Sequence, residues 1–264
     1  RVVALGDIHG DYKKLVSILR HAKLIDQKNN WIGYDSILVQ VGDLMDRASD
    51  IKKIWDLLIK LRKQATKKGG IVYLLLGNHE LSNIQQSNFF ISKKDVDSFG
   101  GISAREESLS MDGKYGPFVR GELNITMIID DTLYSHAGLR LNYAQMGIDE
   151  INNSVHEVFT TSPSYDELYD NYYSQGISHP LYTHTVFDYN NGPLWNRFFS
   201  DEDEKTVCTE LEEVLQVTNT KRMVIGHTVQ DFGEIHTRCD NKLILIDLGL
   251  SRCISDTFGY LEIL

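Results

Sequence analysis

Six residues with oxygen or imidazole side chains follow apolar stretches of the sequence at short intervals. They are Asp7, His9, Asp43, Asn78, His136 and His227. Such groups are costly to bury without partners, so they either cap turns or hold a ligand. Oxygen and imidazole donors without thiolates suit manganese, iron or zinc and do not suit a structural zinc site. The set is too rich for one cation, and it fits two divalent cations bridged by one carboxylate.

Each motif alone has a simpler explanation. A Gly-Asp pair after a strand is usually a turn or a helix cap, and a lone histidine such as His136 is more often an ordinary hydrogen-bonded group. Here several predicted strands are each followed by polar residues of this kind, one by Asp-x-His at residues 7–9 and another by Asn-His-Glu at 78–80. We therefore interpret them together as one site.

The elements that position these residues alternate between strand and helix. Apolar runs at 2–5, 37–41 and 71–76 predict strands, and helical spacing at 15–22 and 51–61 predicts helices between them. This order predicts parallel strands with crossover helices. Loops at the carboxyl ends of parallel strands converge on one crevice, and glycines there let backbone segments pass closely.

The rest of the chain is richer in strands. Two strands joined by a tight turn are expected at 125–129 and 132–135, and strands of a second sheet at 223–225, 233–238, 243–247 and 259–263. Helices are expected near 95–105, 142–158 and 208–217, and an aromatic loop at 160–194. We predict an α/β fold, a sandwich of two mixed β-sheets flanked by helices, in a single catalytic domain spanning 1–264.

The composition restricts the partners. The net charge of −10 argues against nucleic acid as a partner, because such surfaces are basic. It also repels anions at long range, so phosphate binding requires a local positive cluster. No apolar run approaches the roughly 18 residues of a membrane span.

The cysteines and the first residue bear on the cellular compartment. Cys208, Cys239 and Cys253 are few and odd in number, which predicts no disulfide framework and favours a reducing compartment such as the cytoplasm. The sequence starts at Arg1 rather than methionine, so we expect a trimmed chain in which any N-terminal targeting segment would not be seen.

Together, the motifs resemble the ordered signature of the metallophosphoesterases, and more narrowly of the phosphoprotein phosphatases. They read Gly-Asp-Ile-His-Gly at 6–10, Gly-Asp-Leu-Met-Asp-Arg at 42–47, Gly-Asn-His-Glu at 77–80, Ser-His-Ala-Gly at 135–138 and Gly-His-Thr at 226–228. Gly-Pro-Leu-Trp-Asn-Arg at 192–197 and Ile-Asp-Leu-Gly-Leu-Ser-Arg at 246–252 are similar to the Shewanella-like protein phosphatases.

The resemblance implies a role for each matching residue. The first metal would be held by Asp7, His9 and Asp43. The second would share Asp43 and add Asn78, His136 and His227. His79 is implied to be the general acid, oriented by Asp46, and the phosphate-binding residues are Arg47, Arg197 and Asn78. Glu80 has no implied chemical role, and we expect it to support the surroundings of His79 or to cap the next turn.

Electrostatics agrees with these implied roles. Two divalent cations, two carboxylates and one hydroxide leave a net charge of roughly +1, and two arginines add to it. A hydroxide bridging the metals would attack phosphorus directly, because metals lower the pKa of bound water towards about 7. A leaving serine or threonine alkoxide is a strong base, so protonation by His79 matters. The planar fork of arginine binds two phosphate oxygens at once.

The resemblance therefore implies a dinuclear metal-dependent phosphomonoesterase, most simply a protein serine/threonine phosphatase that acts on phosphorylated proteins. A phosphotyrosine preference and diadenosine tetraphosphate hydrolysis are alternatives. A pseudophosphatase that only binds partners is the non-enzymatic alternative.

Three features depart from the family pattern or carry no assigned role. The family continues Asp-Arg-Gly, whereas Arg47 is followed by Ala48, which is strained if that backbone needs a positive φ. The tyrosine-rich stretch 165–189 is expected to be a surface loop that packs on its own domain, with a wall over the substrate as the alternative. Arg105, Arg140 and Arg252 are expected to form salt bridges rather than to bind phosphate.

Overall fold

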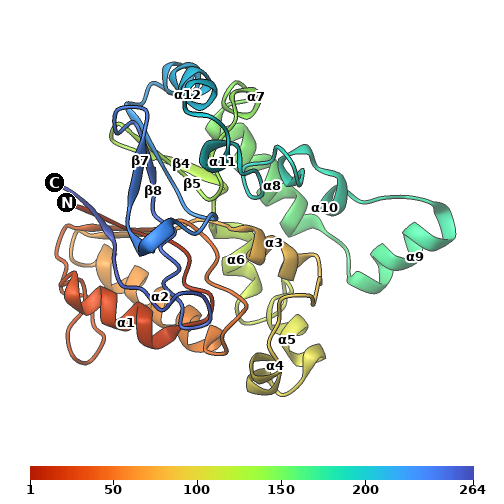
Figure 1. The fold of residues 1–264 in the computed structure, drawn as a ribbon. Helices are drawn as coiled ribbons and strands as arrows, with labels where there is room; N and C mark the ends of the chain where they lie inside the picture. The colour runs from red at the N-terminus through yellow and green to blue at the C-terminus, as the bar shows by residue number, and fades with distance from the viewer.

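Two β-sheets lie face to face at the centre of the molecule, and helices surround them (Figure 1). The computed structural model describes all 264 residues. The first sheet has the strand order β3-β2-β1-β9 and the second has the order β4-β5-β6-β8-β7. Both sheets mix parallel and antiparallel pairs, which confirms the predicted α/β sandwich.

The first sheet starts with the predicted alternation of strands and helices. Strands β1 (Val2–Leu5), β2 (Ile37–Gln40) and β3 (Ile71–Leu74) are parallel. Helices α1 (Tyr12–His21) and α2 (Ile51–Thr66) are the crossovers between them. The three strands therefore point their carboxyl ends to the same edge of the sheet.

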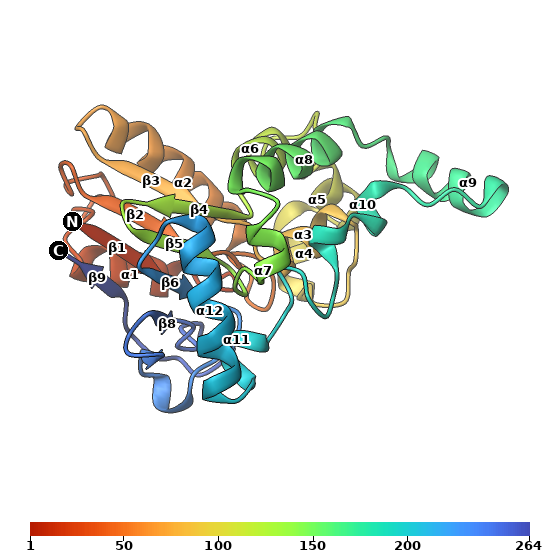
Figure 2. The same cartoon turned by 90° about the horizontal axis from the view of Figure 1, so that it is seen from above.

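The last strand lies in a different sheet from the one predicted. Strand β9 (Leu261–Ile263) pairs antiparallel with β1 in the first sheet, so its predicted place in the second sheet is wrong. The Arg1 Nε atom lies 2.6 Å from the Glu262 carboxylate across this pair. The free edge of β1 accepts the strand, and the two termini consequently lie side by side (Figures 1 and 2).

The second sheet starts with a hairpin. Strands β4 (Thr126–Ile129) and β5 (Thr132–Ser135) are antiparallel, with Asp130 in the left-handed region at the predicted turn. Strands β6 (Arg222–Ile225) and β8 (Leu243–Leu245) extend the sheet in parallel with β5. Strand β7 (His236–Arg238) closes it antiparallel to β8.

The two sheets are joined by a small apolar core. Alternate residues of β1, Val2 and Ala4, face this core, while Val3 and Leu5 face the larger core under the helices. The same period of two appears in the second sheet, where Val224 and Ile244 belong to the core between the sheets. Both faces of the central strands are thus buried, which explains their continuous apolar sequences.

The remaining helices cover the sheets and fill the chain between β3 and β6. Their bounds are α3 (Asn78–Ile84), α4 (Lys93–Phe99), α5 (Ile102–Ser108), α6 (Gly116–Glu122), α7 (Leu141–Ala144), α8 (Ile148–Thr161), α9 (Tyr165–Gln175), α10 (Pro180–Thr183), α11 (Phe198–Asp201) and α12 (Glu204–Thr218). Two short 3-10 turns are Thr185–Phe187 and Asp231–Gly233. No helix combines the length and apolar character needed to cross a bilayer.

The predicted loop at 160–194 is partly helical, which corrects the sequence analysis. Ser164 caps α9 by accepting a hydrogen bond from the Glu167 amide, and Gly176 ends the helix with φ 68°. Acidic residues in the first turn also favour a helix because they face its positive end. Helix α9 projects from the body of the molecule (Figures 1 and 2).

A disulfide bond joins Cys208 and Cys239, so the prediction that the cysteines form no disulfide is wrong. The bond links α12 to the residue after β7, and only Cys253 remains free. The two partners are 31 residues apart in sequence, a pairing that spacing alone does not reveal. Disulfides persist in oxidising environments, so the cysteines no longer support a reducing compartment.

Candidate active site

The loops that follow β1, β2, β3, β5 and β6 converge beside one cleft of about 570 Å³. All ten residues singled out by the sequence lie in or directly behind it. The cleft is lined by His9, Asp43, Arg47, Asn78, His79, Arg197 and His227. Asp7, Asp46 and His136 are buried and contact these residues through hydrogen bonds or close charged pairs. The structure thus brings all ten residues together, and the role assigned to each stays a prediction.

The loops after β1 and β2 are locked together through their backbones. The His9 amide donates to the Asp43 carbonyl at 2.9 Å, and the Ala48 amide donates to the His9 carbonyl at 3.1 Å. His9 and Asp43 both have left-handed backbone conformations, with φ 44° and 57°. Such conformations persist only where surrounding contacts impose them, and they are enriched at functional sites.

The strained positions in the 43–48 loop are not at Ala48. Asp46 and Arg47 have φ 67° and 63°, whereas Ala48 keeps an ordinary negative φ. Ala48 is buried, and its carbonyl lies 2.8 Å from where a Cβ at Gly10 would be. The departure from Asp-Arg-Gly therefore places no strain on the alanine.

Two glycines make room for the carboxylates. A Cβ at Gly77 would lie 2.1 Å from Oδ1 of Asp43, and one at Gly226 would lie 2.5 Å from Oδ1 of Asp7. Any larger residue at either position would displace an acidic side chain of the site. Glycine is therefore required at residues 77 and 226, because the carboxylates of Asp43 and Asp7 pass too close to leave room for a side chain.

Glu80 holds the loop that carries Asp43. Its buried carboxylate accepts hydrogen bonds from the backbone amides of Asp43, Leu44, Met45 and Gly77, at 2.8 to 3.0 Å. Burial and the nearby Asp43 charge raise the pKa of Glu80 to about 7. Glu80 thus ties the end of β2 to the start of α3, where its bond to the Gly77 amide forms the carboxylate half of a capping box.

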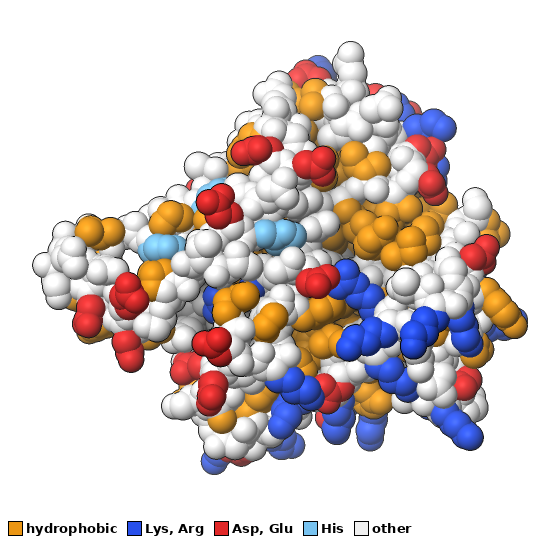
Figure 3. Space-filling view, turned by 180° about the vertical axis from the view of Figure 1, so that it is seen from behind, with side chains coloured by type: hydrophobic (Ala, Val, Ile, Leu, Met, Phe, Trp, Pro, Cys, Tyr) orange, Lys and Arg blue, Asp and Glu red, His pale blue; other side chains and the backbone are white.

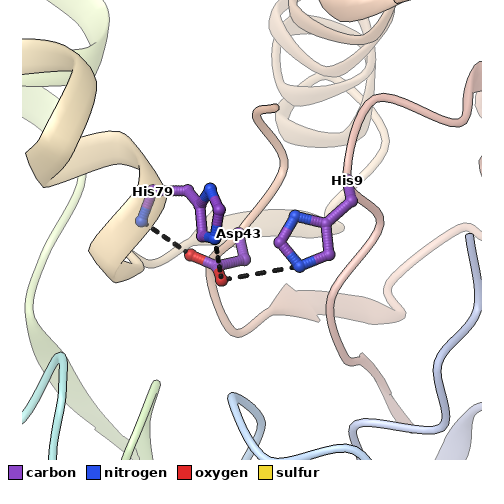
Figure 4. Close-up of side chains that lie close together, drawn as sticks. All are labelled: His9, Asp43 and His79. Carbon is purple, nitrogen blue, oxygen red and sulfur yellow. Dashed lines mark hydrogen bonds and ion pairs between the residues drawn. The ribbon is translucent and has the colours of Figure 1, made fainter. Parts of the chain in front are cut away.

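Asp43 is the centre of the cluster. Its Oδ2 atom lies 3.7 Å from Nε2 of His9 and 3.8 Å from Nε2 of His79 (Figure 4). Nε2 of His9 also lies 3.9 Å from Oδ2 of Asp7. Two donors that share one cation at about 2.1 Å are at most roughly 4.2 Å apart. The Asp7–His9 and His9–Asp43 pairs meet this spacing, and so does the Asp43–His79 pair. The group whose ligand atoms all lie within 4.8 Å of one another is His9, Asp43 and His79, and it does not include Asp7.

The other side of Asp43 faces a second group of donors. Its Oδ1 atom lies 3.5 Å from Nε2 of His136, which is 3.0 Å from Oδ1 of Asn78. Asp43, His136 and His227 form a cluster whose ligand atoms all lie within 4.8 Å of one another. One carboxylate therefore faces two donor groups through its two oxygens, which is the arrangement expected of a bridging ligand.

The histidine rings are oriented by backbone carbonyls. Nδ1 of His9 donates to the Met45 carbonyl at 3.0 Å, and Nδ1 of His136 donates to the Val41 carbonyl at 2.9 Å. Nε2 of His227 lies 3.0 Å from the Trp195 carbonyl. In His9 and His227 the second nitrogen has no hydrogen-bond partner and is left to ligate, as metal-binding histidines require, whereas Nε2 of His136 faces the oxygens of Asn78 and Asp43. These residues therefore fit divalent cations by donor type and ring orientation, and the group of Asp43, His136 and His227 fits by spacing as well.

Burial and charge set the protonation of the cluster. Burial lowers the pKa of His9 to about 4 and that of His227 to about 3, so both rings are neutral near pH 7. Burial and the neighbouring Asp247 and Asp43 carboxylates raise the pKa of Asp7. Burial also opposes ionisation of Asp43, but the adjacent histidines outweigh it and hold its pKa well below the usual range. Neutral imidazoles beside crowded carboxylates are suited to bind cations.

His79 differs from the other rings because its partner is a carboxylate. Its Nδ1 atom lies 2.7 Å from Oδ2 of Asp46, and its Nε2 atom faces the cleft. Burial disfavours the charged ring, but Asp43 and Asp46 outweigh this effect and raise the pKa of His79. A cationic imidazole oriented by a buried carboxylate can donate a proton into the cleft.

A buried network that the sequence analysis missed supports this pair. Asn83 donates to both oxygens of Asp46, at 3.1 and 3.0 Å, and to the His79 carbonyl at 2.7 Å. Arg105 is 1% exposed and donates to Asn83, to Asp46 at 3.3 Å and to Asp95 at 2.6 Å. The only sequence signal was Asn83 at four residues after His79, on the same face of a helix.

The two arginines stand at the mouth of the cleft. The guanidinium of Arg47 lies 4.7 Å above the ring of Phe90. Nη1 of Arg197 donates to Oγ1 of Thr228 at 2.7 Å and to the His227 carbonyl at 3.3 Å. Both side chains are exposed and line the cleft, so they supply the local positive charge that an anion needs in an acidic protein.

Asp247 is a further cleft residue that the predicted site omitted. It is buried, its carboxylate accepts from the Gly249 amide at 3.0 Å, and burial raises its pKa to about 6. It follows strand β8 by two residues, so the strand-end pattern that identified Asp7 and Asp43 also pointed to it.

The other three arginines form ion pairs, as predicted. Arg105 pairs with Asp95, Arg140 with Glu210 at 2.6 Å, and Arg252 with Asp11 and Asp50 at 3.3 Å. Among the tyrosines of 165–189, only Tyr189 lines the cleft, where its ring lies 4.9 Å from that of Trp195.

Comparison with known proteins agrees with this geometry. The chain matches the family described as calcineurin-like phosphoesterase over residues 1–231. It is 32% identical to Shewanella-like protein phosphatase 1 of Plasmodium berghei, over 95% of this chain and 67% of the relative. It is 30% identical to Shewanella-like protein phosphatase 2 of Arabidopsis thaliana, over 97% of this chain and 73% of the relative.

Solved structures share the fold. A cold-active protein-tyrosine phosphatase of a psychrophilic Shewanella species superimposes with a TM-score of 0.79 at 26% identity, over 98% of this chain and 73% of that one. A protein serine/threonine phosphatase from Saccharomyces cerevisiae has a TM-score of 0.54 at 14% identity, over 93% and 66%, which is a likeness of fold alone.

The chain therefore belongs to the calcineurin-like phosphoesterases and, within them, to the Shewanella-like protein phosphatases. It is a metal-dependent phosphatase with candidate metal-binding residues at the carboxyl ends of its strands.

Proposed function

We propose that residues 1–264 form one catalytic domain that hydrolyses phosphate monoesters on proteins, with phosphoserine and phosphothreonine as the preferred substrates. The observation that carries the proposal is the placement of Asp43 between two donor groups, with His79 and the arginines Arg47 and Arg197 around the same cleft. This arrangement combines cation binding, anion binding and proton donation in one space.

The donor groups divide between two cation positions. Asp7, His9 and Asp43 would hold one cation, and Asn78, His136 and His227 would hold the other with Asp43 shared. The cations, when bound, supply an activated water molecule and neutralise charge on the phosphoryl oxygens. The metals are manganese, iron or zinc by donor type, since the set contains nitrogen and oxygen but no sulfur.

The remaining residues act on the phosphate and its leaving group. Arg47 and Arg197 bind the phosphate oxygens, because a guanidinium donates two parallel hydrogen bonds to them. Asn78 contributes through its amide at the edge of the donor group. His79 protonates the departing oxygen, and Asp46 keeps its ring charged and oriented.

A phosphotyrosine preference is the second candidate. It is favoured by the similarity to a structure described as a cold-active protein-tyrosine phosphatase, which covers 98% of this chain. The aromatic side chains of Phe90, Tyr189 and Trp195 line the cleft and offer contacts to a phosphotyrosine ring. Diadenosine tetraphosphate hydrolysis and a pseudophosphatase role have no such specific observation in their favour.

One comparison of substrates tests the proposal. Turnover would be measured with Mn²⁺ on p-nitrophenyl phosphate, on phosphoserine, phosphothreonine and phosphotyrosine peptides of one sequence, and on diadenosine tetraphosphate. The highest kcat/KM on the first two peptides supports the proposal, and the highest value on phosphotyrosine supports the second candidate. Metal-replete protein without turnover on any of these would leave only the binding role.

A further inference from the structure

An exposed aromatic and acidic surface lies on α9 and the turn that follows it. A hollow of about 300 Å³ there is lined mainly by Tyr165, Tyr169, Tyr172, Tyr173, Ile177 and Tyr182. Tyr173 is 69% exposed and Tyr172 is 54% exposed, although both are large aromatic residues. Tyrosines that gather on a projecting helix without covering residues are typical of a binding surface.

The charge of this part of the chain has one sign. Residues 141–196 contain seven Asp or Glu residues and no Lys or Arg. None of these carboxylates forms an ion pair, and Asp166, Glu167 and Asp170 lie on α9 itself. Figure 3 shows acidic and hydrophobic side chains on the projecting part, whereas the Lys and Arg side chains gather elsewhere on this face.

Nearby cations do not neutralise the surface. Arg120 lies close enough to Tyr182 to interact with it, but it is buried and donates to the carbonyls of Leu109 and Phe159. Arg140 precedes the acidic segment and is paired with Glu210. The carboxylates of α9 are therefore free to attract a positively charged partner.

The surface connects to the catalytic cleft. A second hollow of about 680 Å³ shares Tyr182 with the aromatic hollow and Tyr189 with the cleft, and its lining includes Asp188. Gln85, which ends α3, donates to the Leu181 carbonyl at 2.7 Å. The other end of α3 carries Asn78 and His79, about 10 Å away at 1.5 Å per residue.

From this continuity we infer that the α9 surface and the hollow beside it dock a basic segment of the phosphoprotein substrate, with the phosphorylated residue in the catalytic cleft. The inference rests on the proposed function. An extended chain covers about 3.3 Å per residue, so the basic residues lie at least three or four residues from the phosphorylated one. Their guanidinium and ammonium groups stack on tyrosine faces while the carboxylates supply the opposite charge.

Paired phosphopeptides test this docking. Each peptide carries one phosphorylated residue. Within a pair, one peptide has three arginines and the other has three alanines, placed four to seven residues from the phosphorylated residue. These residues lie on its amino side in one set of pairs and on its carboxyl side in the other set. We expect kcat/KM to be about tenfold higher for the arginine peptide of one set, mainly through a lower KM. The preference should weaken as salt is added, because the attraction is between exposed charges.

Two matched triple variants locate the effect. The preference for arginine peptides should be lost in the α9 triple variant Asp166→Asn, Glu167→Gln and Asp170→Asn. It should be reduced in a further double variant, Tyr169→Leu with Tyr173→Leu. The control triple variant removes the same amount of charge from α8, through Asp149→Asn, Glu150→Gln and Glu157→Gln. This variant should keep the preference for arginine peptides. All variants should hydrolyse p-nitrophenyl phosphate at the unaltered rate, because that substrate is too small to reach α9.

The outcomes separate the two proposals. Equal kcat/KM for arginine and alanine peptides, or equal loss in both triple variants, overturns the docking while leaving the phosphatase intact. A dimer in sedimentation that is lost on changing Tyr169 and Tyr173 shows instead that a second copy of the chain covers the surface. Absence of turnover on p-nitrophenyl phosphate in the unaltered protein contradicts the proposed function itself.

Discussion

The catalytic cleft and the α9 surface hold their polar groups in opposite ways. In the cleft, each carboxylate and imidazole is buried and already has a partner, as Asp43, Glu80 and His136 illustrate. On α9, the carboxylates have no ion pairs and the tyrosines are exposed. The cleft is therefore organised before any ligand arrives, whereas the α9 surface gains its partners from another molecule.

Removal of the shared carboxylate should have the largest effect. We expect Asp43→Asn to weaken both cation positions and lower kcat/KM on p-nitrophenyl phosphate by about 10³-fold or more, since several kcal/mol of charge stabilisation is lost. Elemental analysis after dialysis should show lower metal content. Asp35→Asn, which alters an exposed carboxylate in a loop, is the control and should change neither quantity. Retained metal and activity in Asp43→Asn would exclude the bridging role.

Loss of the proton donor should have the next largest effect, and it should depend on the substrate. We expect His79→Asn to slow hydrolysis of serine and threonine phosphates by about 10²-fold, a typical contribution of general acid catalysis. p-Nitrophenyl phosphate should be affected less, because its phenolate leaves without a proton. An equal loss on both kinds of substrate would fit a metal ligand at His79 instead, a role that its distance to Asp43 also permits.

The buried arginine should act more weakly, through Asp46. Arg105→Lys keeps the positive charge but loses the planar fork, so we expect a decrease in kcat of about tenfold on alkyl phosphates with little change in KM. Arg120→Lys is the matched control, because Arg120 is also buried but bonds only to carbonyls remote from the cleft. A uniform loss across leaving groups would indicate a merely structural role for Arg105.

The disulfide should have the smallest effect on turnover. The double variant Cys208→Ser with Cys239→Ser should lower the free energy of unfolding by about 4 kcal/mol, since the bond closes a loop of 31 residues in the unfolded chain. Activity at a temperature where the protein is folded should change by less than about twofold, because neither cysteine lines the cleft. Cys253→Ser removes an exposed free thiol and is the control. Urea unfolding and p-nitrophenyl phosphate turnover measure both effects, and unaltered stability in the double variant would contradict the assignment.

Much of the fold and the named site could be predicted because the signals are local. The period of apolar residues and the polar groups after them identified β1, β2 and β3 and located Asp7, Asp43 and Asn78 at their ends. Parallel strands with crossover helices then leave one edge for those residues to meet. The local prediction was wrong for α9, where tyrosines at helical spacing were interpreted as part of a loop.

The sequence by itself determined the donor types, their position after strands and hence the kind of chemistry. Only the tertiary structure decided which distant groups meet: Arg105 with Asp46, Glu80 with the Asp43 loop, and Cys208 with Cys239. It also placed β9 beside β1, although 255 residues or more separate them. The reason is physical, because helix and strand patterns depend on neighbours in sequence, whereas these contacts depend on how the whole chain packs its two cores.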